Sequence, residues 1–82
     1  MSKKILIIDD SALMRRVISD IIKSGNEYEV AAIAKDGLEG YEYIRQNPTL
    51  YSAVILDINM PKMNGLQLLQ KLQREHIEQT VI

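Results

Sequence analysis

Short apolar runs alternate with amphipathic stretches along this chain of 82 residues. Residues 5–8 form a β-branched apolar run between charged residues, which is typical of a strand buried on both faces of a parallel sheet. Residues 29–34 and 52–56 predict two further strands, and residues 79–82 look like the opening of a fourth. The resulting order, β-α-β-α-β-α-(β), predicts an α/β layered fold with a parallel sheet and right-handed crossovers.

The segments between the predicted strands carry helical patterns. In the first, Asp10 or Ser11 can cap the N-terminus, and Gly25 lies where a left-handed residue commonly ends a helix. In the second, Asp36 and Glu39 form a pair that resembles a capping box. The apolar faces of the three helices are expected at Leu13, Met14, Val17, Ile18, Ile21 and Ile22, at Leu38, Tyr41 and Ile44, and at Leu66, Leu68, Leu69 and Leu72.

Composition narrows the class of protein. With 46% hydrophobic and 26% charged residues the chain is an ordinary globular sequence, and residues 1–82 are expected to form one small domain. A net charge of −1 offers no electrostatic case for binding nucleic acid or an anionic membrane. No apolar run approaches a membrane span and no signal peptide is evident, so we expect a soluble, cytoplasmic protein.

Acidic residues follow two of the predicted strands. Asp9 and Asp10 end the first strand and Asp57 ends the third. In open parallel sheets ligands bind beyond the carboxyl ends of the strands, so the three carboxylates converge if these strands are neighbours. Such crowding requires either shared protons or a cation. Because the chain has no Cys and a single His, all-oxygen ligands are left, and they favour a hard ion such as Mg²⁺.

This arrangement suits phosphoryl chemistry. A carboxylate can attack phosphorus while a metal balances the charge on the phosphoryl oxygens, and Asp57 is the natural attacker because a flexible loop follows it. The competing interpretation is structural, because Asp at a strand-to-helix junction most often caps the helix. Arg15 and Arg16 are expected to be solvated charges on a helix, and His76 a partner of a helix dipole.

The segments Asp9-Asp10-Ser11 and Asp57-Ile58-Asn59-Met60-Pro61-Lys62-Met63-Asn64-Gly65 resemble the receiver domain of bacterial two-component response regulators. The resemblance runs through all 82 residues, and residues 10–16 further resemble receivers of chemotaxis proteins, including the methylesterase regulator. It implies a flavodoxin-like (CheY-like) doubly wound parallel sheet, incomplete here, with strand order 2-1-3-(4). It also implies that Asp57 accepts a phosphoryl group from a histidine kinase or phosphotransfer protein. Mg²⁺ would be held by Asp9, Asp10, Asp57 and the main-chain carbonyl of Asn59.

Residues 1–82 resemble a partial receiver domain, truncated after the start of strand 4. The family also uses a Ser or Thr that ends strand four and a Lys that follows strand five, and neither position exists here. We therefore expect impaired phosphotransfer and a homo-oligomer formed through the truncated edge.

Three functional hypotheses follow. The leading one is a phospho-acceptor receiver module of a two-component pathway, which is a switch rather than an enzyme. The alternative is a self-associating structural half-domain, natural or engineered, that retains only the acidic metal pocket. A phosphatase ranks lowest, because Asp57-Ile58-Asn59 lacks a second acid two residues on.

Overall fold

A computed structural model describes residues 3–58 and 63–82. Within them, β1 (Lys3–Ile8), β2 (Tyr28–Ala34) and β3 (Ala53–Leu56) form a parallel sheet in the order β2-β1-β3. The central β1 pairs Ile8 with Ala34 on one side and with Leu56 on the other. The predicted order 2-1-3 is therefore confirmed. β2 and β3 begin within one residue of their expected positions, and β1 begins two residues earlier than expected.

The beginning of a fourth strand lies beside β3. The Val54 N–H donates to the Thr80 carbonyl (2.9 Å), and the Ile82 N–H donates to the Val54 carbonyl (2.8 Å). Val54 and Val81 form a parallel bridge. The expected strand opening at residues 79–82 is thus present and extends the order to 2-1-3-(4).

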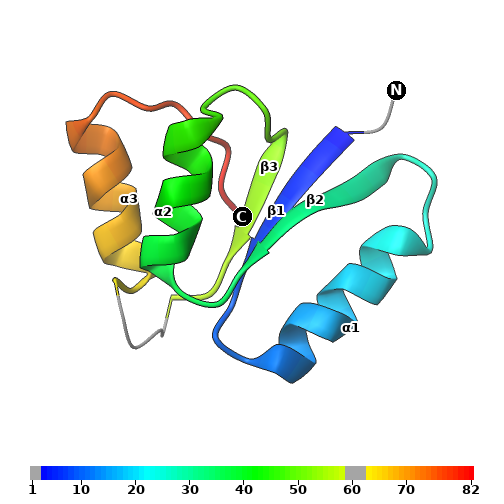
Figure 1. Cartoon of the computed structure of the whole chain (residues 1–82). Coiled ribbons are helices and arrows are strands. Elements are labelled where there is room, and N and C mark those ends of the chain that lie inside the picture. Colours follow the sequence, from blue (N-terminus) through cyan, green and yellow to red (C-terminus); the bar gives the residue numbers. More distant parts are fainter. Residues whose placement is uncertain (1–2, 59–62) are drawn as a thin grey trace.

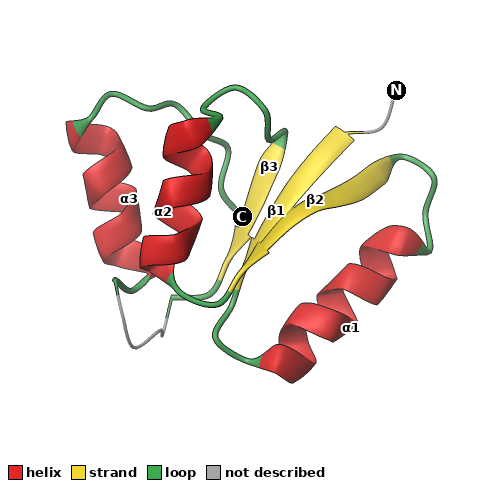
Figure 2. Cartoon of the chain, in the orientation of Figure 1, coloured by secondary structure: helices red, strands yellow, loops and turns green. Residues whose placement is uncertain are grey.

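Three helices cover the sheet on its two sides. Helix α1 (Ala12–Lys23) lies on one face, whereas α2 (Gly37–Gln46) and α3 (Gly65–Arg74) lie together on the other (Figures 1 and 2). The alternation of β1 residues matches these layers, because Leu6 and Ile8 join the core cluster under α2 and α3, and Ile5 and Ile7 join the cluster under α1. None of the helices seen in residues 3–58 and 63–82 has the length and apolarity needed to cross a bilayer.

The helix starts use polar caps. Ser11, rather than Asp10, caps α1, because its Oγ accepts from the Met14 N–H (3.2 Å). Asp36 caps α2 as expected. The expectation for Gly25 was wrong: no described glycine has a positive φ, and α1 ends at Lys23 with Ser24 as its C-cap in the right-handed conformation.

The helix faces are only partly covered. Tyr41, Ile44, Leu68 and Leu72 are buried as expected. The predicted inward positions of Leu38, Leu66 and Leu69 were wrong, since these side chains are exposed. The reason is geometric: the sheet and the neighbouring helix cover only part of each apolar stripe. On α1, Leu13, Met14, Val17 and Ile21 are likewise exposed.

Candidate functional site

Three carboxylates meet at the carboxyl edge of the sheet. The Asp57 N–H donates to the Ile8 carbonyl (2.9 Å), which sets the end of β3 directly beside the end of β1. Carboxylate oxygens of Asp9, Asp10 and Asp57 lie within 4.8 Å of one another. The structure thus brings together the three acids that the sequence predicted to converge. Asn59, the fourth expected ligand, lies outside the described residues.

Asp9 is held by hydrogen bonds at three atoms. Its N–H donates to the Ala34 carbonyl (3.1 Å), and its Oδ1 accepts from the Ser11 N–H (2.9 Å). Its carbonyl accepts from Nη1 of Arg15 (2.8 Å). Asp9 is only 9% exposed, whereas Asp10 is exposed and Asp57 is half-buried. The cluster therefore combines a fixed, buried carboxylate with two that solvent can reach.

Gly65 supports the loop that carries Asp57. Its N–H donates to the Ile58 carbonyl (3.0 Å), and a Cβ on Gly65 would lie 2.8 Å from the Ile58 Cα and 3.0 Å from the Asp57 carbonyl oxygen. Only a residue without a side chain allows α3 to start so close to this backbone. At the same edge, a Cβ on Gly37 would overlap the Met63 carbonyl, so the start of α2 also packs closely on the segment before α3.

The donor set fits a hard divalent cation. The three groups are carboxylates, with neither His nor Cys in the cluster as far as the described residues extend. Oxygen-only sites that keep open positions for water or phosphate suit Mg²⁺. Helix capping does not explain the cluster, because Ser11 supplies the side-chain cap of α1 and Asp57 precedes a loop.

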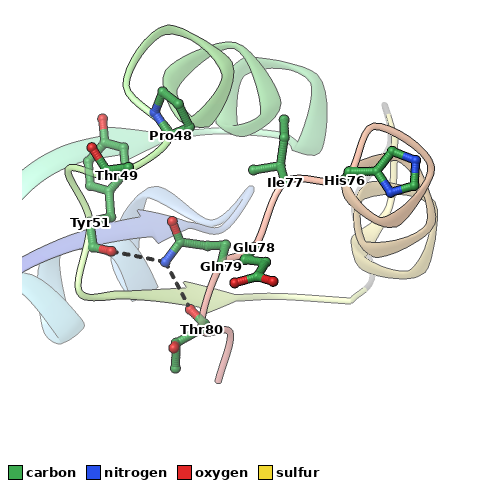
Figure 3. A pocket seen from close by; sticks show the side chains of 8 residues that line it. All are labelled: Pro48, Thr49, Tyr51, His76, Ile77, Glu78, Gln79 and Thr80. Atoms are coloured by element: carbon green, nitrogen blue, oxygen red, sulfur yellow. Dashed lines mark hydrogen bonds between the residues drawn. The ribbon is translucent and has the colours of Figure 1, made fainter.

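A separate cavity lies at the opposite end of the sheet (Figure 3). It measures about 850 Å³ and lies between the segment before β3 and the segment that follows α3. Nε2 of Gln79 donates to the carbonyls of Tyr51 (3.1 Å) and Thr80 (3.3 Å) and so joins the two segments. The cavity wall carries a single carboxylate, that of Glu78. It lacks the converging acids that a cation needs, so the acidic edge remains the candidate site.

Comparison with known proteins identifies a matching protein family and related sequences. A family model described as the response regulator receiver domain matches residues 5–82. A protein-glutamate methylesterase/protein-glutamine glutaminase of Methanococcus maripaludis is 49% identical over 67 residues, which make up 80% of this chain and 18% of that protein. A second protein with that name, from Oceanobacillus iheyensis, is 44% identical over 87% of this chain and 20% of its own length. The chain thus spans about a fifth of these curated relatives.

Solved structures agree on the fold. The response regulator domain of CheB from Thermotoga maritima superimposes with a TM-score of 0.86 at 35% identity, over 99% of this chain and 58% of that one. A chain from the CheX–CheY complex of Borrelia burgdorferi with BeF₃ and Mg²⁺ gives a TM-score of 0.87 at 28% identity, over 96% of this chain and 58% of that one. The incomplete flavodoxin-like architecture is therefore confirmed, and the chain belongs to the family of response regulator receiver domains.

Proposed function

We propose that this chain is a phospho-acceptor receiver module of the chemotaxis methylesterase type, with Asp57 as the acceptor. One observation carries the proposal: carboxylates from two adjacent parallel strands converge within 4.8 Å at the edge where such sheets bind ligands. Asp9, Asp10 and Asp57, together with the main-chain carbonyl of Asn59, would hold Mg²⁺. When bound, Mg²⁺ would neutralise charge on the oxygens of the transferred phosphoryl group.

Position and exposure favour Asp57 over its neighbours as the acceptor. Asp9 is buried, and its Oδ1 already accepts from the Ser11 N–H. Asp10 leads into α1, whereas Asp57 is half-buried and follows β3. In the proposed step, a carboxylate oxygen of Asp57 bonds to the phosphorus of a phosphohistidine. The phosphorus–nitrogen bond breaks, and the imidazole nitrogen keeps the electron pair.

The donor would be a histidine kinase or a phosphotransfer protein. This partner is proposed from the family, and the related CheY chain in a complex that contains Mg²⁺ supports the choice of metal. The chain matches 18–20% of the two methylesterase relatives, and the role proposed for it is the regulatory one of a receiver domain. The alternative of a purely structural half-domain gains no support from these relatives.

Phosphorylation by a small donor tests the proposal. Acetyl phosphate with Mg²⁺ is expected to add one phosphoryl group to the wild-type chain, detected by intact-mass spectrometry.

Two variants locate the modification. Asp57→Asn should abolish the adduct, whereas Asp20→Asn, which changes an exposed acid on α1, should keep it. Circular dichroism would establish that both variants are folded. An adduct that persists in Asp57→Asn, or a folded wild type that takes up Mg²⁺ but no phosphoryl group, would contradict the proposed acceptor.

A further inference from the structure

Arg15 reaches from α1 to the acidic edge. Its Nη1 donates to the Asp9 carbonyl at 2.8 Å, in a partly buried contact that spans six residues of sequence. The expectation that Arg15 is a solvated charge was therefore wrong. Arg16 does behave as expected, since it is exposed and its side chain makes no hydrogen bond or ion pair with residues 3–58 and 63–82.

The contact completes the restraint of the turn between β1 and α1. The Arg15 N–H donates to the Ser11 carbonyl (2.9 Å), while its guanidinium donates to the Asp9 carbonyl. The Ser11 N–H in turn donates to Oδ1 of Asp9. Hydrogen bonds from a charged donor are stronger than those between neutral groups. The first turn of α1 is thus hydrogen-bonded to the end of β1. The bond from the Ser11 N–H to Oδ1 of Asp9 also sets the direction of the Asp9 carboxylate.

We propose that Arg15 is a positioning residue for the cation site, holding the turn of residues 9–11 so that the carboxylates of Asp9 and Asp10 face Asp57. The inference rests on the proposed function, because the cation is the one expected for a receiver. It goes further by assigning a role to a side chain that is not itself a ligand. Groups that orient metal ligands through hydrogen bonds typically contribute about 10–100-fold to metal affinity.

The positive charge of Arg15 opposes Mg²⁺ binding, whereas its hydrogen bond to Asp9 is expected to favour it. A guanidinium near the site repels a divalent cation, so a neutral substitution relieves repulsion while it loosens the turn. Arg16 allows the two effects to be separated, because Arg16→Gln removes the same charge from the same helix without touching Asp9. The difference between Arg15→Gln and Arg16→Gln therefore reports positioning.

Calorimetric titration with Mg²⁺ provides the first measurement. We expect Arg15→Gln to bind Mg²⁺ about tenfold more weakly than Arg16→Gln, at the lower end of the range for orienting groups, because Arg15 contacts the main chain of a ligand residue. Arg15→Lys should recover most of the affinity, since an ammonium group can still donate to the Asp9 carbonyl. Thermal melting of all variants would check that they are folded. Equal affinities of Arg15→Gln and Arg16→Gln would overturn the inference.

Hydrogen exchange of the metal-free protein provides the second measurement. The Ser11 amide, which donates to Asp9, should exchange faster in Arg15→Gln than in Arg16→Gln. If the wild type takes up no Mg²⁺, the proposed metal site fails, and the exchange result alone decides whether Arg15 holds the turn. Equal exchange in the two variants would reject the positioning role regardless of metal binding.

Discussion

His76 shapes the turn that ends α3. It has a φ of 57°, in the left-handed region that favours glycine. Its N–H donates to the Gln73 carbonyl (3.2 Å), and the Ile77 N–H donates to the Leu72 carbonyl (3.0 Å). These two bonds form a Schellman motif, and Ile77 packs against the core cluster that contains Leu72. His76 thus acts through its backbone conformation, a role that helix periodicity does not indicate.

Replacing His76 with glycine is expected to stabilise the protein. Glycine adopts this conformation without the steric cost that a Cβ brings, although part of the gain is lost to the greater freedom of the unfolded chain. We expect a net gain of roughly 0.5–1 kcal/mol in the free energy of unfolding, measured by urea denaturation. His76→Ala, which keeps the Cβ, is the control and should give no such gain. A destabilised His76→Gly would contradict this account of the turn.

At the scale of elements, a polar contact joins α2 to the end of α3. The Tyr41 hydroxyl donates to Oε1 of Glu75, and Nζ of Lys71 lies 3.2 Å from Oε2 of the same carboxylate. Nζ of Lys71 also lies 4.7 Å from the centroid of the Tyr41 ring. The hydrogen bond from Tyr41, followed by that from Lys71, lowers the pKa of Glu75 below its ordinary value. The same bond raises the pKa of Tyr41.

This contact makes stability depend on pH. Because the pKa of Glu75 is lower in the folded state, its contribution is present above the pKa of the unfolded state, about 4.3, and is lost as the pH falls through the folded value. The contribution of Tyr41 is present below its unfolded pKa and is lost as the pH rises through the raised folded value.

Tyr41→Phe tests this pH dependence. The stability difference between wild type and variant should be largest near neutral pH and should shrink on acidification, as measured by urea denaturation across pH. In the variant, the pKa of Glu75 should move up toward its ordinary value in an NMR titration. Lys3→Gln, which changes an exposed pair with Glu27 at the far side of the sheet, is the control and should leave that pKa unchanged. An unchanged Glu75 titration in Tyr41→Phe would exclude the contact.

At Gly65, the start of α3 packs closely against the backbone of Asp57 and Ile58 at the acidic edge. Gly65→Ala should destabilise the protein by about 1–3 kcal/mol, because the new Cβ would lie 2.8 Å from the Ile58 Cα and the backbone would have to move. Affinity for Mg²⁺ should fall with it, since the displaced backbone carries Asp57. Gly25→Ala is the matched control, because its Cβ would meet nothing closer than the Ile22 carbonyl oxygen at 3.8 Å. Equal stability of the two variants would show that Gly65 is not constrained.

At the scale of the whole molecule, the layers of helices and strands and the position of the acidic edge were predicted correctly from the sequence. The exposure of several apolar side chains on the helices was not. The succession of strands and helices, and the acids that end the first and third strands, follow from apolar runs and connection lengths, which are local properties of the chain. The strand order 2-1-3, which makes Asp9 and Asp57 neighbours, was implied by the resemblance to receiver domains. The side-chain contact of Arg15 and the backbone conformation of His76 could not be predicted from such local patterns. Each depends on a hydrogen bond to a particular backbone carbonyl. The exposure of Leu66 was missed for a related reason: periodicity identifies an apolar stripe but not how much of it the neighbouring elements cover.

The uncovered stripe on α1 leads to a prediction about assembly. Leu13, Val17 and Ile21 recur every four residues, and Leu13 and Ile21 are 70% and 65% exposed. The total accessible surface of 5386 Å² exceeds the roughly 5,000 Å² expected for a monomer of this mass. Apolar surface of this extent favours association, so the 82-residue chain is expected to form a dimer whose population rises with concentration.

Sedimentation velocity over a range of concentrations measures that assembly. The double substitution Leu13→Gln and Ile21→Gln should shift the chain to monomer, because it removes the two most exposed apolar groups of the stripe. Leu66→Gln is the control: it removes a side chain that is 58% exposed on α3, across the sheet from α1, and should leave the dimer intact. A wild type that remains a compact monomer and melts cooperatively at every concentration would exclude association. Equal effects of the α1 and α3 substitutions would instead indicate nonspecific apolar contact.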